Sequence, residues 1–272
     1  MSKTILITGA SSGIGKSTAI HFQNNGWNVI ATMRSPEKED ELIDLKNVLV
    51  TKLDVVDLDS IDQAVKTGIE TFGQIDVLVN NAGYGAYGPL EAFPRENIVK
   101  QFNTNVIGLL DVTRAVLPHF RSNQSGTIIN ISSIGGKMTF PLGSLYHGTK
   151  FAVEGISEAL SFELEAVGVK VKIVEPGIIA TDFAGRSFDF QNNPELLEYQ
   201  ETVGKIMQAF SSQDGPVPSP PQLVAEVIYE AASDSSRKMR YPAGADAHQY
   251  LSTRKAIDED DFIQGIKDQF QL

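Results

Sequence analysis

Tyr146 and Lys150 stand four positions apart in the segment Y-H-G-T-K, and Ser133 lies thirteen residues before the tyrosine. If the segment is helical, positions i and i+4 share one face, so the Lys150 ammonium lies beside the Tyr146 phenol. A free tyrosine has a pKa near ~10, and a neighbouring cation favours the phenolate and lowers that pKa. This pair could then transfer protons at neutral pH. Because surface helices also carry such pairs, the rest of the chain has to support this interpretation.

Apolar, β-branched segments alternate with helical patterns from the start of the chain to about residue 180. The strand-like segments are Thr4–Thr8, Asn28–Thr32, Val48–Leu53, Ile75–Asn80, Gly126–Ser132 and Val169–Glu175. The helical patterns lie near 14–25, 57–72, 96–121 and 147–167. Such alternation is typical of a parallel sheet covered on both faces. It predicts an α/β fold in one domain over residues 1–272, with its core at residues 1 to about 180.

The pattern changes after the sixth strand. Residues 181–222 combine aromatic side chains with the breaker-rich segment G-P-V-P-S-P-P at 215–221. Pro194–Phe210 is expected to form one or two short helices, and we interpret 181–222 as a substrate lid inserted in the domain. A helix near 222–233, a short strand around Met239–Tyr241 and an acidic tail at 258–261 are expected to form a C-terminal extension.

Composition excludes several classes of function. The net charge of -11 disfavours nucleic acids and anionic membranes as partners. The absence of cysteine excludes disulfides, thiolate catalysis and Cys-ligated zinc. No metal site is expected, because the histidines lack ligand spacing and are interpreted as structural or surface residues: His21, His119, His147 and His248. Neither a signal peptide nor an apolar run of the ~18–20 residues that span a membrane is present, so a soluble cytoplasmic protein is expected.

A glycine-rich turn, T-G-A-S-S-G-I-G at Thr8–Gly15, follows the first strand and opens the first helix. Its glycines permit a tight turn, and the helix N-terminus favours a pyrophosphate. The spacing is G-x-x-x-G-x-G rather than the usual dinucleotide fingerprint G-x-G-x-x-G. The turn nevertheless predicts a nucleotide site, with contacts from Gly9, Ser11, Ser12, Gly13, Ile14 and Gly15.

An alternative interpretation of the same turn is the phosphate loop of nucleoside triphosphatases. Ala10–Ser17 reads A-S-S-G-I-G-K-S and is close to G-x-x-x-x-G-K-[ST]. However, Ala10 replaces the first glycine, and no later strand ends in an aspartate placed for magnesium. The ATPase is therefore the weaker alternative.

The end of the second strand distinguishes between the nicotinamide cofactors. A carboxylate there binds a ribose 2′-hydroxyl, whereas an arginine can bind a 2′-phosphate. Here the strand runs V-I-A-T-M-R and ends in Met33 and Arg34, and the first carboxylate is Glu37. This predicts NADP(H) in preference to NAD(H), unless Arg34 is only a solvated loop residue.

In combination, these motifs resemble the short-chain dehydrogenase/reductase family. The resemblance covers residues 3 to about 185 and adds D-V at 54–55, N-N-A-G at 80–83, N-V-I-G at 105–108, I-S-S at 131–133 and P-G-I-I-A-T at 176–181. It implies a doubly wound parallel sheet and nicotinamide-dependent hydride transfer on an alcohol or carbonyl. It also implies assembly as a homodimer or homotetramer through the helices near 96–121 and 147–167. N-N-A-G-Y-G and R-Y-P-A-G-A-D-A at 240–247 are most similar to retinol- and hydroxysteroid-dehydrogenase-like reductases.

The resemblance implies a role for each matching residue. Tyr146 would be the general acid/base, Lys150 would lower its pKa and bond the nicotinamide ribose, and Ser133 would bond the substrate oxygen. Asn105 would bend a helix and hold a water that connects Lys150 to solvent. Further cofactor contacts would be Asp54 and Val55 at the adenine, Asn81, Ala82 and Gly83 at the adenosine side, and Pro176, Gly177, Ile178 and Thr181 at the carboxamide. Three alternatives remain open: Asn105 as an ordinary helix residue, Asp54 as a helix cap, and Thr181 as a lid hinge.

The candidates for the substrate walls are six aromatic residues and one leucine. They are Tyr84, Tyr87, Phe140, Leu142, Phe183, Phe188 and Phe190. Aromatic walls with few charges suggest a lipophilic small-molecule ketone or alcohol, although several of these side chains could instead belong to the core. A second class of function is an NADP(H)-binding sensor or scaffold without turnover. The four filled catalytic positions argue against it.

Overall fold

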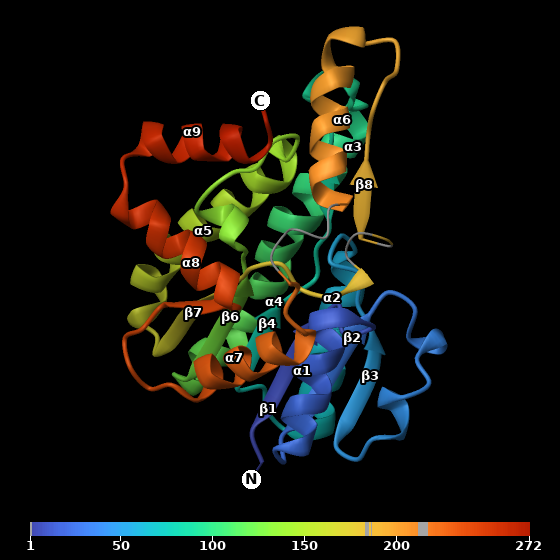
Figure 1. The fold of residues 1–272 in the computed structure, drawn as a ribbon. Coiled ribbons are helices and arrows are strands. Elements are labelled where there is room, and N and C mark those ends of the chain that lie inside the picture. Colours follow the sequence, from blue (N-terminus) through green and yellow to red (C-terminus); the bar gives the residue numbers. More distant parts are fainter. Residues whose placement is uncertain (1, 183–184, 186, 212–216) are drawn as a thin grey trace.

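The structure is a computed structural model, and it describes residues 2–182, 185, 187–211 and 217–272. Seven parallel strands form the central sheet in the order β3-β2-β1-β4-β6-β7-β9 (Figure 1). Their bounds are β1 Thr4–Thr8, β2 Asn28–Met33, β3 Val48–Lys52, β4 Val77–Asn80, β6 Gly126–Ile131, β7 Val169–Pro176 and β9 Arg240–Ala243. The strand order reverses between β1 and β4, where ligands bind in doubly wound sheets. The predicted fold class is confirmed.

Helices cover both faces of the sheet, which explains why the strands are continuously apolar. Ile5 and Ile7 of β1 pack with Phe22 on one face, whereas Leu6 packs with Val116 on the other. The first face is covered by α1 (Gly13–Asn24) and α7 (Pro221–Ser233). The second is covered by α2 (Leu58–Phe72), α4 (Gly108–Asn123) and α5 (Ser144–Glu165).

The helix expected near 96–121 is divided into three parts. α3 (Arg95–Phe102) continues into a π-helical turn at Asn103–Ile107 and then into α4. Short 3₁₀ turns elsewhere occupy Pro36–Lys38, Leu42–Asp44, Leu90–Ala92 and Ile134–Gly136. π-turns are rare and often occur at functional sites. This one contains Asn105, one of the predicted catalytic residues.

The predicted lid segment contains a strand that the sequence did not indicate. β8 (Phe188–Phe190) pairs in parallel with β5 (Gly85–Tyr87), and the two form a separate small sheet. The next element is a single helix, α6 (Leu197–Ser211), where one or two short helices were expected. β8 and α6 extend beyond the main sheet beside α3 (Figure 1).

Two helices that were not predicted follow β9. α8 (Ala245–Ala256) and α9 (Glu259–Gln269) pack on Ile134 and Met138 through Leu251 and Phe262. The residues expected to form an acidic tail begin α9 instead, and the Asp258 side chain caps it by accepting from the Asp260 amide at 2.9 Å. Carboxylates are favourable at a helix N-terminus because they interact with its dipole. Among the residues described, no helix is both long enough and apolar enough to cross a membrane.

Candidate active site

A cavity of about 2220 Å³ runs along the carboxyl ends of the strands. Residues from the ends of six strands line it: Gly9 after β1, Arg34 after β2, Asp54 after β3, Asn81 after β4, Ser133 after β6 and Gly177 after β7. Sites for drug-sized ligands are usually ~300–1,000 Å³. This cavity therefore has room for a ligand as long as a dinucleotide together with a second molecule.

The glycine-rich turn forms one wall of the cavity. Gly9 and Gly13 have positive φ values of 69° and 53°, and Ser11, Ser12, Gly13 and Ile14 line the cavity at the start of α1. Gly15 lies beneath the turn rather than in its wall, and a Cβ there would overlap the Gly9 carbonyl. The free amides of a helix N-terminus bind anions. The turn therefore fits the pyrophosphate of a dinucleotide.

The side chain of Lys16 contradicts the ATPase interpretation. Its Nζ lies 2.9 Å from Glu39 Oε1 and 2.9 Å from Glu41 Oε2, in the segment after β2. Lys16 does not line the cavity. In a phosphate loop this lysine has to reach the β- and γ-phosphates. Here the two ion pairs hold it away from the turn.

The cavity end near β2 and β3 has the groups predicted for an adenosine. Met33, Arg34, Asp54 and Val55 line it, and Arg34 is exposed. Asp54 does not cap the following helix, because that role belongs to Asp57, which accepts from the Ser60 amide at 3.3 Å. The Asp54 carboxylate instead accepts from the Val56 amide at 3.2 Å. The helix-cap alternative for Asp54 is therefore wrong.

Asn81 fixes the point where the strand order reverses. Its Nδ2 donates to the carbonyls of Thr8 at 2.9 Å and Gly9 at 3.1 Å. The Thr8 hydroxyl in turn accepts from the amides of Asn81 and Ala82, both at 3.0 Å. These bonds join the ends of β1 and β4. Asn81, Ala82 and Gly83 all line the cavity, and their contact with a cofactor stays a prediction.

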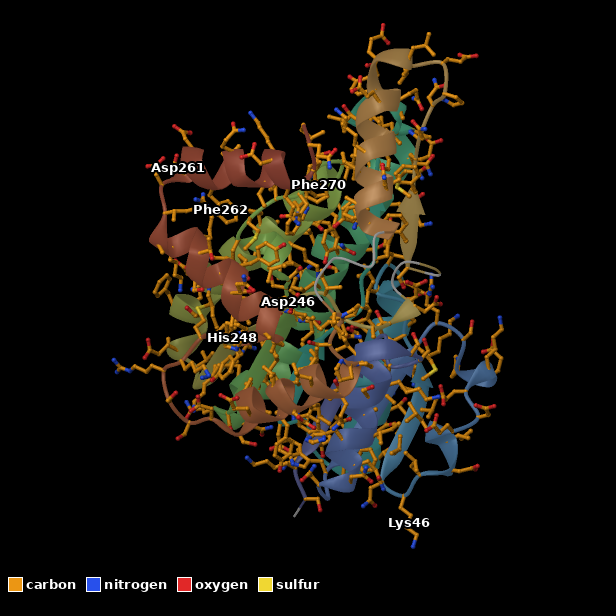
Figure 2. All side chains as sticks on the ribbon, in the orientation of Figure 1. Lys46, Asp246, His248, Asp261, Phe262 and Phe270 are labelled. Carbon is orange, nitrogen blue, oxygen red and sulfur yellow. The ribbon has the colours of Figure 1, made fainter. Side chains whose placement is uncertain are left out.

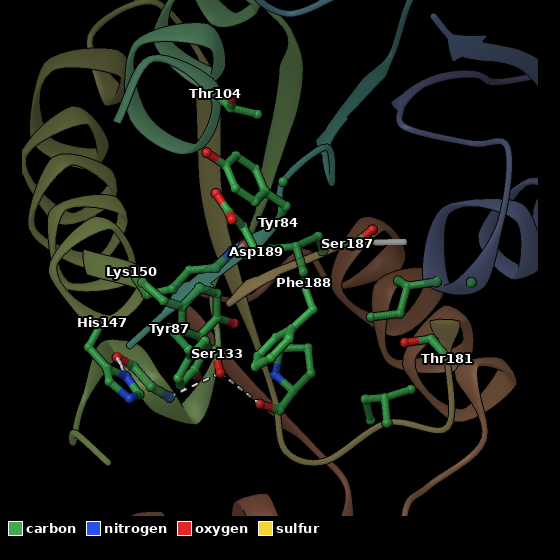
Figure 3. Close-up of a pocket in the computed structure, with 18 of the residues that line it drawn as sticks. Tyr84, Tyr87, Thr104, Ser133, His147, Lys150, Thr181, Ser187, Phe188 and Asp189 are labelled. Carbon is green, nitrogen blue, oxygen red and sulfur yellow. Dashed lines mark hydrogen bonds between the residues drawn. The ribbon is translucent and has the colours of Figure 1, made fainter. Parts of the chain in front are cut away.

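Ser133, Tyr146 and Lys150 line the far end of the cavity. Figure 3 shows Ser133 and Lys150 there. The Ser133 hydroxyl is hydrogen-bonded to Tyr146 and accepts from the Gly135 amide at 3.0 Å. Lys150 Nζ lies 5.8 Å from the centroid of the Tyr146 ring and donates to the Ile131 carbonyl at 2.8 Å. The predicted proton-transfer group is thus assembled from the end of β6 and one face of α5.

The pKa of Tyr146 is not shifted in the expected direction. Burial raises the pKa of its phenol, and only the Ser133 hydrogen bond opposes that shift. Burial also lowers the pKa of Lys150 to about 8, against the attraction of Glu154. Lys150 Nζ donates to the Ile131 carbonyl, and at Tyr146 desolvation outweighs the expected stabilisation of the phenolate.

Asn105 lies behind the cavity and not in its lining. Its side chain accepts from the Tyr84 amide at 3.1 Å, and it donates to the Tyr84 carbonyl at 2.8 Å and the Thr149 hydroxyl at 3.1 Å. Thr149 lies between Tyr146 and Lys150 on α5. Asn105 therefore connects the π-turn to Tyr84, the residue before β5, and to Thr149 on α5. Its role in holding a water stays a prediction.

The predicted substrate residues divide into three groups. Tyr84, Tyr87, Phe140 and Phe188 line the cavity, and Tyr87 lies 5.5 Å from Tyr146 and 5.2 Å from Phe188 between ring centroids. Leu142 does not line it, and its carbonyl accepts from the Gly88 amide at 2.8 Å. Phe190 packs on Phe188 at 6.2 Å outside the cavity lining. Phe183 lies outside the described residues.

Sequence reasoning missed three wall residues. Tyr250, Phe210 and Phe270 line the cavity from α8, α6 and the residue after α9, and His147, which was interpreted as structural or surface, lines it as well. Five aromatic side chains form a closed circuit beside Tyr146, which we call the aromatic collar: Tyr87, Phe210, Phe270, Phe140 and His147. Successive centroids in the collar are 6.3, 5.9, 6.3, 5.8 and 6.0 Å apart. No local pattern marks Phe210 or Phe270, because their contacts join distant segments.

His147 is held in one tautomer by its hydrogen bonds. The Phe140 amide donates to Nε2 at 3.0 Å, so Nδ1 carries the proton and donates to the Gly135 carbonyl at 2.9 Å. Burial lowers the pKa of the imidazole, which favours the neutral form. His147 therefore connects the turn after Ser133 to the wall at Phe140.

The carboxamide segment predicted after β7 lies next to Ser133. Pro176, Gly177, Ile178 and Thr181 line the cavity, and the Ser133 hydroxyl approaches the Pro176 carbonyl at 3.5 Å. A Cβ on Gly13 would lie 3.2 Å from Thr181 Cγ2, so Thr181 contacts the glycine-rich turn. Within the part of the chain that the structure describes, no three His, Cys, Asp or Glu side chains are grouped to hold a metal ion.

Comparisons with known proteins identify the family. The sequence profile described as short chain dehydrogenase matches residues 3–192. An uncharacterised oxidoreductase of Schizosaccharomyces pombe is 47% identical over 245 residues, covering 88% of this chain and 100% of that protein.

Two solved structures have the same fold. A short-chain dehydrogenase from Streptomyces avermitilis has a TM-score of 0.83 at 34% identity, covering 100% of this chain and 97% of that one. ElxO with bound NADP has a TM-score of 0.76 at 31% identity, covering 92% of this chain and 100% of that one. The chain therefore belongs to the short-chain dehydrogenase family, whose members are nicotinamide-dependent oxidoreductases that act on small molecules.

Proposed function

We propose that the protein transfers hydride between NADP(H) and the carbonyl or alcohol carbon of a lipophilic small molecule, with Tyr146 as the general acid/base. The observation that carries the proposal is the continuity of one cavity. It extends from the glycine-rich turn and Arg34 to the hydrogen-bonded Ser133 and Tyr146. A dinucleotide bound along it would have its reactive end beside the phenol.

NADP(H) is proposed as the preferred cofactor because of the groups at the adenosine end. Arg34 is exposed there and lines the cavity, whereas Glu37 does not. A guanidinium offers several donors to a phosphate, and no carboxylate at the end of β2 competes for a ribose hydroxyl. The NADP carried by ElxO, a relative of this chain, agrees with that preference.

The proposed mechanism uses the protonated form of Tyr146. Ser133 and Tyr146 would together hold the substrate oxygen, and both hydroxyls would stabilise the negative charge that develops on it. Because burial raises the pKa of Tyr146, its proton is retained at neutral pH and is available to the oxygen. When bound, the cofactor supplies or accepts the hydride. Lys150, with a pKa of about 8, would return a proton to the phenol after each reduction.

The aromatic collar supports a lipophilic substrate. Two of its members, Tyr87 and His147, lie beside Tyr146, the proposed proton donor, each with ring centroids 5.5 Å apart. Aromatic side chains bury large apolar areas and make favourable ring contacts. An apolar group attached to the carbonyl carbon would therefore bind favourably in the collar, because it is removed from water. A charged group would bind unfavourably there, because it would lose its hydration.

A panel of aliphatic and aromatic ketones, followed by the oxidation of NADPH, tests the proposal. Tyr146→Phe should lower kcat about 10²–10⁴-fold, because it removes the proton donor and keeps the ring. Its dissociation constant for NADPH should stay within about twofold of wild type. Near-full turnover by Tyr146→Phe would contradict the mechanism. Tight NADPH binding by the wild type without turnover of any ketone would instead support the sensor.

A further inference from the structure

The segment R-Y-P-A-G-A-D-A at 240–247 forms β9 and the first turn of α8. β9 pairs in parallel with the end of β7, where Ala243 is the partner of Pro176. The pairing continues past the strand, since the Gly177 amide donates to the Ala243 carbonyl at 3.0 Å. The C-terminal part of the chain thus directly supports the backbone that enters the cavity after β7.

Asp246 supports the next residue of this backbone, Ile178. Its Oδ2 accepts from the Ile178 amide at 2.6 Å, and the residue is only 8% exposed. Figure 2 shows Asp246 at the inner end of α8, whereas Asp261 on α9 points outward from the molecule. The carboxylate lies in the first turn of a twelve-residue helix, where the helix dipole favours a negative charge.

Two glycines leave the space that the carboxylate needs. A Cβ on Gly177 would overlap the Asp246 carboxylate, and so would a Cβ on Gly244. Gly244 also has a φ of 113°, which is unfavourable for residues with a side chain. The contact between Asp246 and Ile178 therefore depends on a local backbone built around it.

The supported backbone borders the reacting end of the cavity. The Pro176 carbonyl lies 3.5 Å from the Ser133 hydroxyl, and Pro176, Gly177 and Ile178 line the cavity. Arg34 and Asp54 line it from the ends of β2 and β3, on the opposite side of the glycine-rich turn. A dinucleotide extended between these ends would place its nicotinamide half against residues 176–178.

We propose that Asp246 is a positioning residue, which fixes the Ile178 amide and thereby the wall against which the nicotinamide half binds. This inference rests on the proposed function. Asp246 does not line the cavity, so it acts through the backbone and not by touching the cofactor. A hydrogen bond to a charged acceptor in a buried place is among the stronger bonds in proteins.

The test compares two ligands that differ only in the nicotinamide. Dissociation constants of NADPH and of 2′-phospho-ADP-ribose, which lacks the nicotinamide, are measured by calorimetry with the full-length chain. Asp246→Ala should weaken NADPH about tenfold or more and 2′-phospho-ADP-ribose less than twofold. Asp246→Asn should keep most of the affinity, because its amide oxygen still accepts from Ile178.

Asp258→Ala is the matched control. It removes a carboxylate that also accepts an amide at a helix start, but Asp258 does not line the cavity or contact the segment after β7. It should lower Tm without changing the ratio of the two dissociation constants. If Asp246→Ala does not fold, Asp246→Ser is the second variant, since serine suits a helix start but is too short to reach Ile178.

Each outcome is decisive. Equal weakening of both ligands by Asp246→Ala, or by Asp246→Ser, would show a general structural role and overturn the inference. No weakening of either ligand would overturn it as well. Failure of the proposed NADP(H) binding is distinguishable, because the wild-type protein would then bind neither NADPH nor 2′-phospho-ADP-ribose.

Discussion

At the scale of single residues, burial acts in opposite directions on the two proposed proton carriers. It raises the pKa of Tyr146 and lowers that of Lys150 to about 8, because in each case the charged form loses hydration. The two groups are therefore both protonated just below neutral pH, the state required for donating a proton to a carbonyl oxygen. Lys150 is the member whose titration should limit activity at alkaline pH.

Glu154→Gln should move the alkaline limit of ketone reduction to lower pH. The Glu154 carboxylate raises the pKa of Lys150 against the effect of burial, so its removal lowers that pKa below about 8. Reduction needs protonated Lys150, so activity is lost as pH rises through this pKa. The variant should therefore lose activity at a lower pH than wild type. The pH profile of kcat/KM measures the shift. Glu158→Gln is the control, because Glu154 and Glu158 both accept from Arg240, whereas Glu154 is buried and Glu158 is exposed. Coincident profiles for Glu154→Gln and wild type would contradict the assignment.

Arg34→Ala should raise the KM for NADPH about 10- to 100-fold and leave that for NADH within about twofold. The loss corresponds to ~1.5–3 kcal/mol for a hydrogen-bonded charge pair with the 2′-phosphate. Steady-state kinetics with both cofactors measure the ratio. Lys46→Ala is a suitable control, because Lys46 is an exposed cation outside the cavity lining (Figure 2). An unchanged NADPH-to-NADH ratio in Arg34→Ala would remove the argument for NADP(H).

At the scale of elements, the segment between β6 and α5 depends on His147. This side chain binds the Gly135 carbonyl and the Phe140 amide, and Gly135 and Gly143 leave room for its ring because neither has a Cβ. The same segment carries Ser133 at its start. The imidazole of His147 thus positions both the segment that begins with the proposed catalytic residue Ser133 and the Phe140 side of the aromatic collar.

The stability of the protein should decrease below pH 6.5 in a way that depends on His147. Its pKa is lowered in the folded state, so the unfolded chain takes up a proton first. The contribution of neutral His147 is complete above its unfolded pKa of ~6.5 and is lost as pH falls below it. The free energy of unfolding is measured with urea at pH 7.5 and at pH 5.5. It should change less between these two pH values in His147→Gln than in wild type.

The expected decrease is at most about 1.4 kcal/mol per pH unit, the limit for one proton. His248→Gln is the control, because His248 is exposed on α8 (Figure 2). If His147→Gln and wild type lose the same free energy between the two pH values, other groups determine the acid sensitivity.

At the scale of the whole molecule, apolar side chains remain exposed on helices expected to form a subunit interface. Phe102 and Ile107 on the α3–α4 run are 37% and 48% exposed, and Phe151 and Phe162 on α5 are 45% and 73% exposed. Exposed apolar groups gathered on neighbouring elements are typical of protein interfaces. They support the proposal of a homodimer or homotetramer through these helices.

Phe162→Glu should shift the protein toward the monomer. A charge buried at an interface in place of an apolar ring weakens association by on the order of several kcal/mol, which is comparable to the loss of a hot-spot residue. Light scattering after size-exclusion chromatography measures the mass. Leu197→Glu is the control, because Leu197 is 75% exposed but belongs to α6, which is not one of the proposed interface helices. A wild-type mass of one chain would contradict the proposed assembly.

The sequence by itself determined the alternation of strands and helices, the glycine-rich turn and the shared face of Tyr146 and Lys150. These features are local: successive residues of β1 alternate between two apolar faces, and four residues make about one helical turn. Only tertiary structure decided the pairing of β5 with β8, the entry of Phe210 and Phe270 into the collar, and the contact of Asp246 with Ile178. It also decided the direction of the Tyr146 pKa, because desolvation depends on every segment packed around the phenol and not on Lys150 alone.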